Sequence, residues 1–204
     1  MSRYLVIDSE TTGLDPESNG LITFSAVVYE NQNKIAQWHG ANKQWDKFVI
    51  DTSALRVNNI SFYSSDFFSV SSSNIVSGNA EAGYYLLETY ETFVKFLTAF
   101  LIENAPACDF LMGMNVQFDL AFLKKACRSF NINIEGLLPR KQIDPLIIAS
   151  SMSDTGLYYK NMKYINSKNL YECHGISHEG IHRSDVDVRL TFELWQKMKK
   201  DFLS

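Results

Sequence analysis

The sequence predicts an α/β fold in which helices cover the faces of a mixed β-sheet. Three segments rich in β-branched and aromatic residues follow one another near the start of the chain, as in an antiparallel meander. After them, short apolar segments alternate with segments whose apolar residues recur at every third and fourth position, as in amphipathic helices. A meander followed by alternating strands and helices is typical of a mixed sheet with helices on its faces.

The predicted meander opens the chain. Residues 3–8, 21–30 and 34–38 are the three predicted strands, and the Asn-Gln-Asn sequence at 31–33 forms the turn between the last two. The Asp-Thr-Ser sequence at 51–53 then supplies a cap for a short helix.

The segment 61–83 has a different composition from its surroundings. Ser, Asn and Gly dominate it, and the aromatic residues Phe62, Phe67 and Phe68 are interspersed among them. A long segment of this kind inside a compact domain is either functional or disordered. Two interpretations stay open, a mobile surface loop or hairpin and a flap whose aromatic residues cover a substrate.

The rest of the chain alternates between helices and short strands. The predicted elements are a helix over 86–103, a strand over 110–114, a helix over 116–130, a strand and turn over 142–145, a helix from there to about residue 151, a loop over 153–166, a helix over 167–173 and a helix over 185–200. Asp144 and Pro145 form a helix start, and Gly175 marks a helix end. Because no repeat or linker interrupts this order, we expect a single domain over residues 1–204.

The composition is that of an ordinary globular protein. The chain has 204 residues, of which 46% are hydrophobic and 21% charged, which argues against a disordered protein. The formal net charge of −4 argues against strong non-specific binding to duplex nucleic acid but permits a local groove for a short single strand. The three cysteines, Cys108, Cys127 and Cys173, have no paired spacing and are expected to be reduced thiols. With no signal-peptide pattern and no apolar run of bilayer length, a cytoplasmic protein without a membrane segment is expected.

Two acidic residues stand at the end of the first predicted strand. Asp8 and Glu10 are two positions apart, so their side chains project to the same face of the strand. Neighbouring carboxylates repel each other unless a cation lies between them. Carboxylate oxygens are hard ligands of the kind that Mg²⁺ and Mn²⁺ prefer. The pair therefore predicts a metal site if further carboxylates come close in the fold.

A third acid, Asp119, lies one turn into a helix that follows the end of a strand at Asn115. From this position its carboxylate can be directed at the strand end. The alternative is that Asp119 only complements the dipole of the helix N-terminus.

A fourth acid follows a histidine near the end of the chain. Gly180 and Ser184 place His182 in a loop before the last helix, and Asp187 lies in the first turn of that helix. The alternative is structural, because Ser184 and Asp187 have the spacing of a capping box. Under that interpretation His182 is incidental.

These signals form an ordered set along the chain. The set consists of Asp8-x-Glu10 followed by Thr-Thr-Gly, Asn115-x-x-Phe118-Asp119, and His182 five residues before Asp187. It resembles the three motifs of the DEDDh family of 3′→5′ exonucleases, the DnaQ-like enzymes that include proofreading exonucleases, RNase T and oligoribonuclease. Residues 54–60 and the Ile143-Asp144 step also resemble landmarks of that family. Met114 departs from the histidine often found there, and Arg183 replaces the tyrosine of the sister DEDDy class.

The resemblance implies a fold, a reaction and a set of residue roles. The fold is ribonuclease H-like, a five-stranded mixed sheet flanked by helices. The reaction is two-metal hydrolysis of single-stranded DNA or RNA from its 3′ end, with 5′-mononucleotides as products and two Mg²⁺ or Mn²⁺ ions per site. Asp8 would bridge both ions, Glu10 and Asp187 would complete the first, and Asp119 would hold the second. His182 would act as general base.

The resemblance also implies contacts with the terminal nucleotide. Backbone N–H groups of the turn Thr11-Thr12-Gly13-Leu14 would bind the 3′-hydroxyl, and Leu14 would wedge against the last bases, although simple packing also explains Leu14. Asn115 and Phe118 are candidates for contact with the terminal nucleotide, and helix-core packing is the alternative for Phe118. The aromatic residues of 61–83 are candidates for base stacking.

Three functional hypotheses follow from these residues. The leading one is an active exonuclease on single-stranded DNA or RNA 3′ ends. The second is a catalytically inactive exonuclease-like module that binds nucleic acid or a polymerase, and the third is another two-metal hydrolase. Because all four acids and His182 are present, the active enzyme is favoured. The family also allows a polymerase partner and a homodimer.

Overall fold

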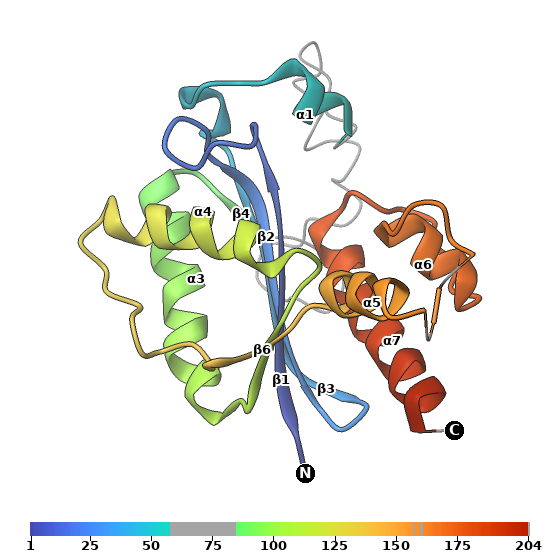
Figure 1. Cartoon of the computed structure of the whole chain (residues 1–204). Coiled ribbons are helices and arrows are strands. Elements are labelled where there is room, and N and C mark those ends of the chain that lie inside the picture. Colours follow the sequence, from blue (N-terminus) through green and yellow to red (C-terminus); the bar gives the residue numbers. More distant parts are fainter. Residues whose placement is uncertain (58–84, 157, 160, 204) are drawn as a thin grey trace.

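The computed structural model describes residues 1–57, 85–156, 158, 159 and 161–203. The predicted flap at 61–83 lies outside these residues. Figure 1 shows one central sheet with a layer of helices on each side. The predicted α/β class with a mixed sheet is confirmed.

The sheet has the strand order β4-β3-β2-β1-β5-β6. Its strands are β1 (Arg3–Thr11), β2 (Leu21–Glu30), β3 (Asn33–Asn42), β4 (Tyr85–Leu87), β5 (Phe110–Met112) and β6 (Lys141–Ile143). The strands β1, β2 and β3 form the predicted antiparallel meander, while β5 joins β1, β6 joins β5 and β4 joins β3 in parallel.

The predicted count of five strands is wrong, because the described residues contain six. The additional strand is β4, which extends the sheet beyond β3. Its three residues are too few to show an alternating pattern, and the predicted helix over 86–103 includes two of them, Leu86 and Leu87. That helix, α3 (Tyr90–Asn104), begins after Thr89, whose hydroxyl oxygen accepts a hydrogen bond from Thr92 N at 3.1 Å.

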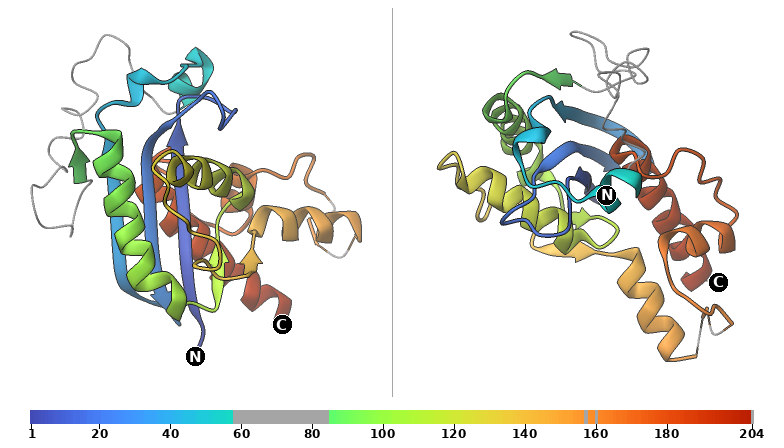
Figure 2. Two further views of the ribbon diagram at one scale, coloured as in Figure 1. Left: turned by 90° about the vertical axis from the view of Figure 1, so that its left-hand side faces the viewer. Right: turned by 90° about the horizontal axis from the view of Figure 1, so that it is seen from above.

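Helices α3 and α4 (Val116–Arg128) cover one face of the sheet (Figure 2). The alternation of β1 directs Leu5 and Ile7 toward them. Apolar residues of α3 and α4 complete this core; the fully or almost fully buried ones include Phe93, Val94, Leu97, Leu101, Phe122 and Leu123. The predicted helix over 116–130 therefore exists and has its apolar stripe on the sheet side.

The other face is covered by α7 (Ser184–Leu203), with α5 (Pro145–Asp154) and α6 (Ser167–Cys173) beside it. On this face Tyr4 and Val6 of β1 pack with Val188 and Phe192 of α7. The rings of Phe192 and Tyr29 stack with centroids 3.8 Å apart. Asp144 caps α5 as expected, accepting hydrogen bonds from Leu146 N and Ile147 N.

The α7 face of the sheet changes from apolar to polar along β1. Directly paired residues of an antiparallel sheet project to the same face. Val6 pairs with Val27, but the next position on this face is Asp8, which pairs with Ser25, and after it Glu10 pairs with Thr23. The acidic pair therefore lies where the apolar contact between α7 and the sheet ends.

The short helix α1 (Thr52–Val57) lies beyond the carboxyl end of β1 (Figure 1). Its one buried residue, Leu55, packs on Ile22, and the 3-10 helix Trp45–Lys47 lies between β3 and α1 in the chain. A second 3-10 helix, Ala105–Ala107, extends α3. Within the described residues, none of the helices combines the length and apolar character needed to cross a membrane.

Candidate active site

Three of the four predicted acids meet in space. Asp8 and Glu10 come from the end of β1 and Asp187 from the first turn of α7. One carboxylate oxygen from each lies within 4.8 Å of those of the other two. Two elements far apart in the sequence are needed for this arrangement, and the packing of α7 on β1 brings them together.

Burial and mutual repulsion make the ionised form of this cluster unfavourable without a counter-ion. Burial, followed by repulsion from Asp119, Asp187 and Glu10, raises the pKa of Asp8 well above 3.8. Burial and the neighbouring acids also raise the pKa of Glu10, and burial raises the pKa of Asp187 to about 6. A divalent cation removes this repulsion, and an all-oxygen donor set suits Mg²⁺ or Mn²⁺. The residues present therefore fit the predicted metal.

Asp119 approaches from the other helix layer. It lies in the first turn of α4, is 2% exposed, and accepts a hydrogen bond from Ser9 Oγ at 2.6 Å. Burial raises the pKa of Asp119 to about 7. Asp119 is not part of the three-carboxylate cluster, but its charge raises the pKa of both Asp8 and Glu10. Asp119 therefore borders the cluster. Its carboxylate is held by Ser9, the residue between Asp8 and Glu10 in β1.

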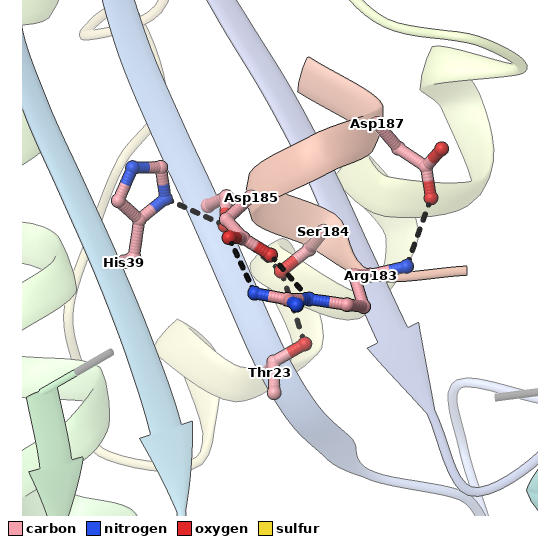
Figure 3. A network of polar contacts seen from close by, with 7 residues as sticks. Thr23, His39, Arg183, Ser184, Asp185 and Asp187 are labelled. Carbon is pink, nitrogen blue, oxygen red and sulfur yellow. Dashed lines mark hydrogen bonds and ion pairs between the residues drawn. The ribbon is translucent and has the colours of Figure 1, made fainter. Parts of the chain in front are cut away.

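His182 lies in the loop before α7, as predicted. Its backbone has a φ of 66°, and Gly180 two residues earlier has a φ of 80°. Asp187 Oδ2 accepts a hydrogen bond from His182 N at 2.9 Å. It also accepts one from Arg183 N at 3.1 Å (Figure 3). The Asp187 carboxylate thus fixes the backbone that carries the histidine. Partial burial lowers the pKa of His182 below 6.5, so the imidazole is neutral at pH 7 and can accept a proton.

Ser184 and Asp187, whose spacing allowed a capping box as the structural alternative, contact other groups as well. The carboxylate of Asp187 accepts from Arg183 N, one residue before Ser184. The hydroxyl of Ser184 contacts Thr23 and Ser25 of the sheet. The spacing of Ser184 and Asp187 indicates a local motif. It does not reveal that the Ser184 side chain faces the sheet.

A cavity of about 390 Å³ opens over the acids. This volume lies within the range of roughly 300 to 1,000 Å³ typical of small-ligand pockets. The cavity is lined by Asp8, Ser9, Glu10, Thr11, Leu14, Ser53, Ala54, Val57, Met114, Phe118, Ser167, Tyr171, Ile181, His182 and Asp187. The structure therefore places Thr11, Leu14 and Phe118 beside the acids, and Leu14 is 77% exposed.

Two predicted substrate contacts do not lie in this cavity. Thr12 is fully buried, its N–H donates to Gly20 O at 2.9 Å, and its hydroxyl donates to Val49 O at 2.7 Å. The Thr12 N–H therefore already has a partner in the turn, and its contact with a 3′-hydroxyl stays a prediction. Asn115 is exposed and is absent from the cavity lining, and its left-handed backbone, with a φ of 60°, makes the turn into α4.

Several cavity residues were not predicted from the sequence. Ser53, Ala54 and Val57 come from α1, and Tyr171 comes from α6. Tyr171 is buried, and burial followed by the nearby Asp187 carboxylate raises its pKa. Ala54 and Val57 belong to the segment 54–60 that resembles a family landmark, but the resemblance gave them no role. Ser53 and Tyr171 resemble ordinary helix positions, so only the packing of α1 and α6 around the acids identifies them.

Replacing Asp119 by Asn is expected to stabilise the metal-free protein at pH 8. The amide is neutral and its oxygen can still accept the Ser9 hydrogen bond. Burial raises the pKa of Asp119 from 3.8 to about 7, so the folded state loses stability as the pH rises through that value. We expect the advantage of Asp119→Asn over the parent protein to grow by roughly 1 kcal/mol between pH 6.5 and 8.

Thermal unfolding in EDTA at several pH values measures this difference, which corresponds to roughly 2–4 °C in Tm. Saturating Mn²⁺ is the control, because an ion that neutralises the carboxylate removes the advantage of the amide. An advantage that does not depend on pH would contradict the account given for Asp119.

The family model RNase_T, described as an exonuclease, matches residues 5–195. The 3′-5′ exonuclease DinG of Staphylococcus aureus strain USA300 is 25% identical over 213 residues, which cover 100% of this chain and 20% of that protein. The chain thus spans about a fifth of the length of this curated relative.

Solved structures share the fold. The zinc-bound E. coli ExoI complex with single-stranded DNA superposes with a TM-score of 0.74 at 16% identity, covering 98% of this chain and 41% of that chain. E. coli exonuclease I in complex with a dA16 oligonucleotide gives a TM-score of 0.72 at 17% identity, with the same coverage of 98% and 41%. At this identity the likeness concerns the fold, which includes the mixed sheet and its flanking helices.

Proposed function

Because the chain belongs to the DEDD-type 3′→5′ exonuclease family, whose model it matches over residues 5–195, we propose that it removes 5′-mononucleotides from the 3′ ends of single-stranded nucleic acid. The observation that carries this proposal is the meeting of Asp8, Glu10 and Asp187 in one cavity with His182. The curated relative, a 3′-5′ exonuclease, supports the direction of hydrolysis. The ExoI complex with single-stranded DNA supports the class of substrate.

Electrostatics in the cavity favour a metal-dependent reaction. The acids and a phosphodiester are all anionic, so a bound substrate needs cations between itself and the protein. Asp8, Glu10 and Asp187 would hold one Mg²⁺ or Mn²⁺ ion, and Asp8 and Asp119 would hold a second. When bound, such ions neutralise the phosphate, activate water and stabilise the leaving oxygen.

The chain itself supplies the base and the position of the base. His182 is neutral near pH 7 and accepts the proton of the attacking water as the new oxygen–phosphorus bond forms. The bond from phosphorus to the 3′-oxygen of the preceding nucleotide then breaks, and this oxygen takes a proton from solvent water to become the new 3′-hydroxyl. The hydrogen bonds from His182 N and Arg183 N to Asp187 hold the loop that presents the imidazole.

The walls of the cavity suit a terminal nucleotide. Leu14 and Val57 are exposed apolar side chains that line the cavity, and Phe118 adds an aromatic ring to the lining. Apolar and aromatic surfaces bind the face of any base without reading sequence. We therefore expect little sequence preference.

A labelled-substrate assay tests the proposed function. Oligonucleotides of matched sequence, as DNA and as RNA and in several lengths, carry a 5′ label and are incubated with Mg²⁺ or Mn²⁺. We expect a ladder of products that shortens from the 3′ end, and we expect EDTA to abolish it. Binding without shortening would favour the inactive module, and cleavage at internal positions would favour another hydrolase.

A further inference from the structure

A row of polar side chains crosses the sheet beneath the first turn of α7. Asp8 pairs with Ser25 of β2, and Ser25 pairs with His39 of β3, so the three lie side by side on one face. Glu10 pairs with Thr23 in the neighbouring position. We call Thr23, Ser25 and His39 the polar row. All three side chains are buried, with exposed fractions of 6%, 0% and 7%.

Ser184, the first residue of α7, lies on this polar row (Figure 3). Its hydroxyl lies 3.0 Å from Thr23 Oγ1 and 2.8 Å from Ser25 Oγ, and Ser25 Oγ lies 2.9 Å from His39 Nδ1. Ser184 is fully buried. These groups form a connected chain of hydrogen bonds from β3 through β2 to α7.

The position of Ser184 links this chain to the acids and the histidine. Ser184 lies two residues after His182 and three before Asp187. Hydrogen bonds are directional, so two of them made by one hydroxyl, as donor in one and acceptor in the other, fix the rotation of the first helical turn about its axis more closely than apolar contacts do. The orientation of that turn determines where the Asp187 carboxylate and the His182 backbone lie.

The helix itself is anchored elsewhere. Phe192 stacks on Tyr29, and Val188, Leu190 and Leu194 are buried against neighbouring elements. Loss of the Ser184 hydroxyl therefore leaves α7 docked on the sheet. We expect the loss of this hydroxyl to free only the first turn of α7.

We propose that Ser184 is a positioning residue that holds His182 and Asp187 in place through the polar row. Its effect on activity rests on the proposed exonuclease function. Its effect on the geometry of the turn does not.

The polar row is uncharged under the conditions of an assay at pH 7–8. Burial lowers the pKa of His39 to about 4, against the opposing charge of Asp185 and with a small contribution from Lys34. The His39 imidazole thus acts as a hydrogen-bonding group. A difference in activity between a variant and the parent protein at pH 7–8 therefore reflects altered geometry and not altered charge on His39.

Three variants test the proposal. Ser184→Ala removes the central hydroxyl, and Thr23→Val removes one partner while keeping its shape. Thr98→Val is the matched control, because Thr98 is also buried, at 3% exposure, but bonds to Val94 O within α3 on the other side of the sheet. Amide hydrogen exchange at His182 and Arg183, calorimetric titration with Mn²⁺, and kcat and KM on a labelled oligonucleotide are compared.

We expect Ser184→Ala and Thr23→Val to accelerate exchange of the two amides and to weaken Mn²⁺ binding roughly 10-fold. We expect kcat to fall roughly 10- to 100-fold with little change in KM, because the loss is one of alignment. Thr98→Val should leave all of these unchanged. Unaltered amide exchange and Mn²⁺ affinity in Ser184→Ala would overturn the proposal, as would equal changes in the control.

If Ser184→Ala does not fold, Thr23→Val decides by the same measurements. If the parent protein binds Mn²⁺ but does not hydrolyse any oligonucleotide, the proposed function fails. Amide exchange and Mn²⁺ affinity then still decide the role of Ser184.

Discussion

Replacing Asp8 by Asn is expected to reduce hydrolysis roughly 1,000-fold or more and to abolish tight Mn²⁺ binding. The carboxylate of Asp8 is repelled by those of Asp119, Asp187 and Glu10, and each of them raises its pKa. An amide keeps the shape of the side chain but removes the charge that holds a cation. Because bound metals contribute several kcal/mol to such reactions, losing one corresponds to this fall in rate.

The same substitution should make the metal-free protein more stable. Burial and repulsion both oppose the ionised form of Asp8, and the amide relieves them. Calorimetric titration with Mn²⁺, an exonuclease assay and thermal unfolding in EDTA measure the three effects together. Asp46→Asn is the matched control, since Asp46 is an exposed acid in the 3-10 helix Trp45–Lys47. Mn²⁺ binding by Asp8→Asn equal to that of the parent protein would disprove the site.

Replacing His182 by Ala is expected to lower kcat roughly 100- to 10,000-fold, the usual contribution of a general base. Fold and Mn²⁺ affinity should stay near their original values. The hydrogen bond to Asp187 comes from the backbone N–H of His182, so it survives loss of the imidazole. The expected result is therefore a folded, metal-binding protein with little turnover.

A second variant separates the imidazole from backbone strain. His182 has a φ of 66°, a conformation that Asn adopts more easily than Ala. If His182→Ala and His182→Asn lose turnover equally, strain is not the cause. His178→Ala, in the same loop region, is the control and should remain active. Hydrolysis near the parent rate by His182→Asn would remove the histidine from the mechanism.

The shared direction of Asp8 and Glu10 could be predicted because strand geometry is simple. Asp8 and Glu10 project together for a reason that depends only on the two-residue period of a strand. The strands of the meander and the helix α3 could also be predicted, because each has enough residues to show the periodicity of its secondary structure. β4 has only three residues and shows no period, so the predicted helix over 86–103 includes its Leu86 and Leu87.

Long-range hydrogen bonds decided the features that the sequence did not reveal. Thr12 appeared available for substrate, but its N–H and hydroxyl are bound to Gly20 and Val49. Ser184 resembled a helix cap, but its hydroxyl contacts β2. Nothing in the local sequence distinguishes these partners from solvent. The single domain, the homodimer and the polymerase partner stay predictions, since they depend on surfaces and not on motifs.

One strand carries groups that serve both sides of the sheet. Ser9 faces α4 and bonds to Asp119, while Asp8 and Glu10 face α7. A pairing error of one residue between β1 and β2 would turn every side chain to the opposite face. It would bury two carboxylates against the α4 core and expose a lone serine to Asp187. A chain misfolded in this way would be unable to bring its acids together. Nuclease activity would therefore require that β1 and β2 pair in the correct register.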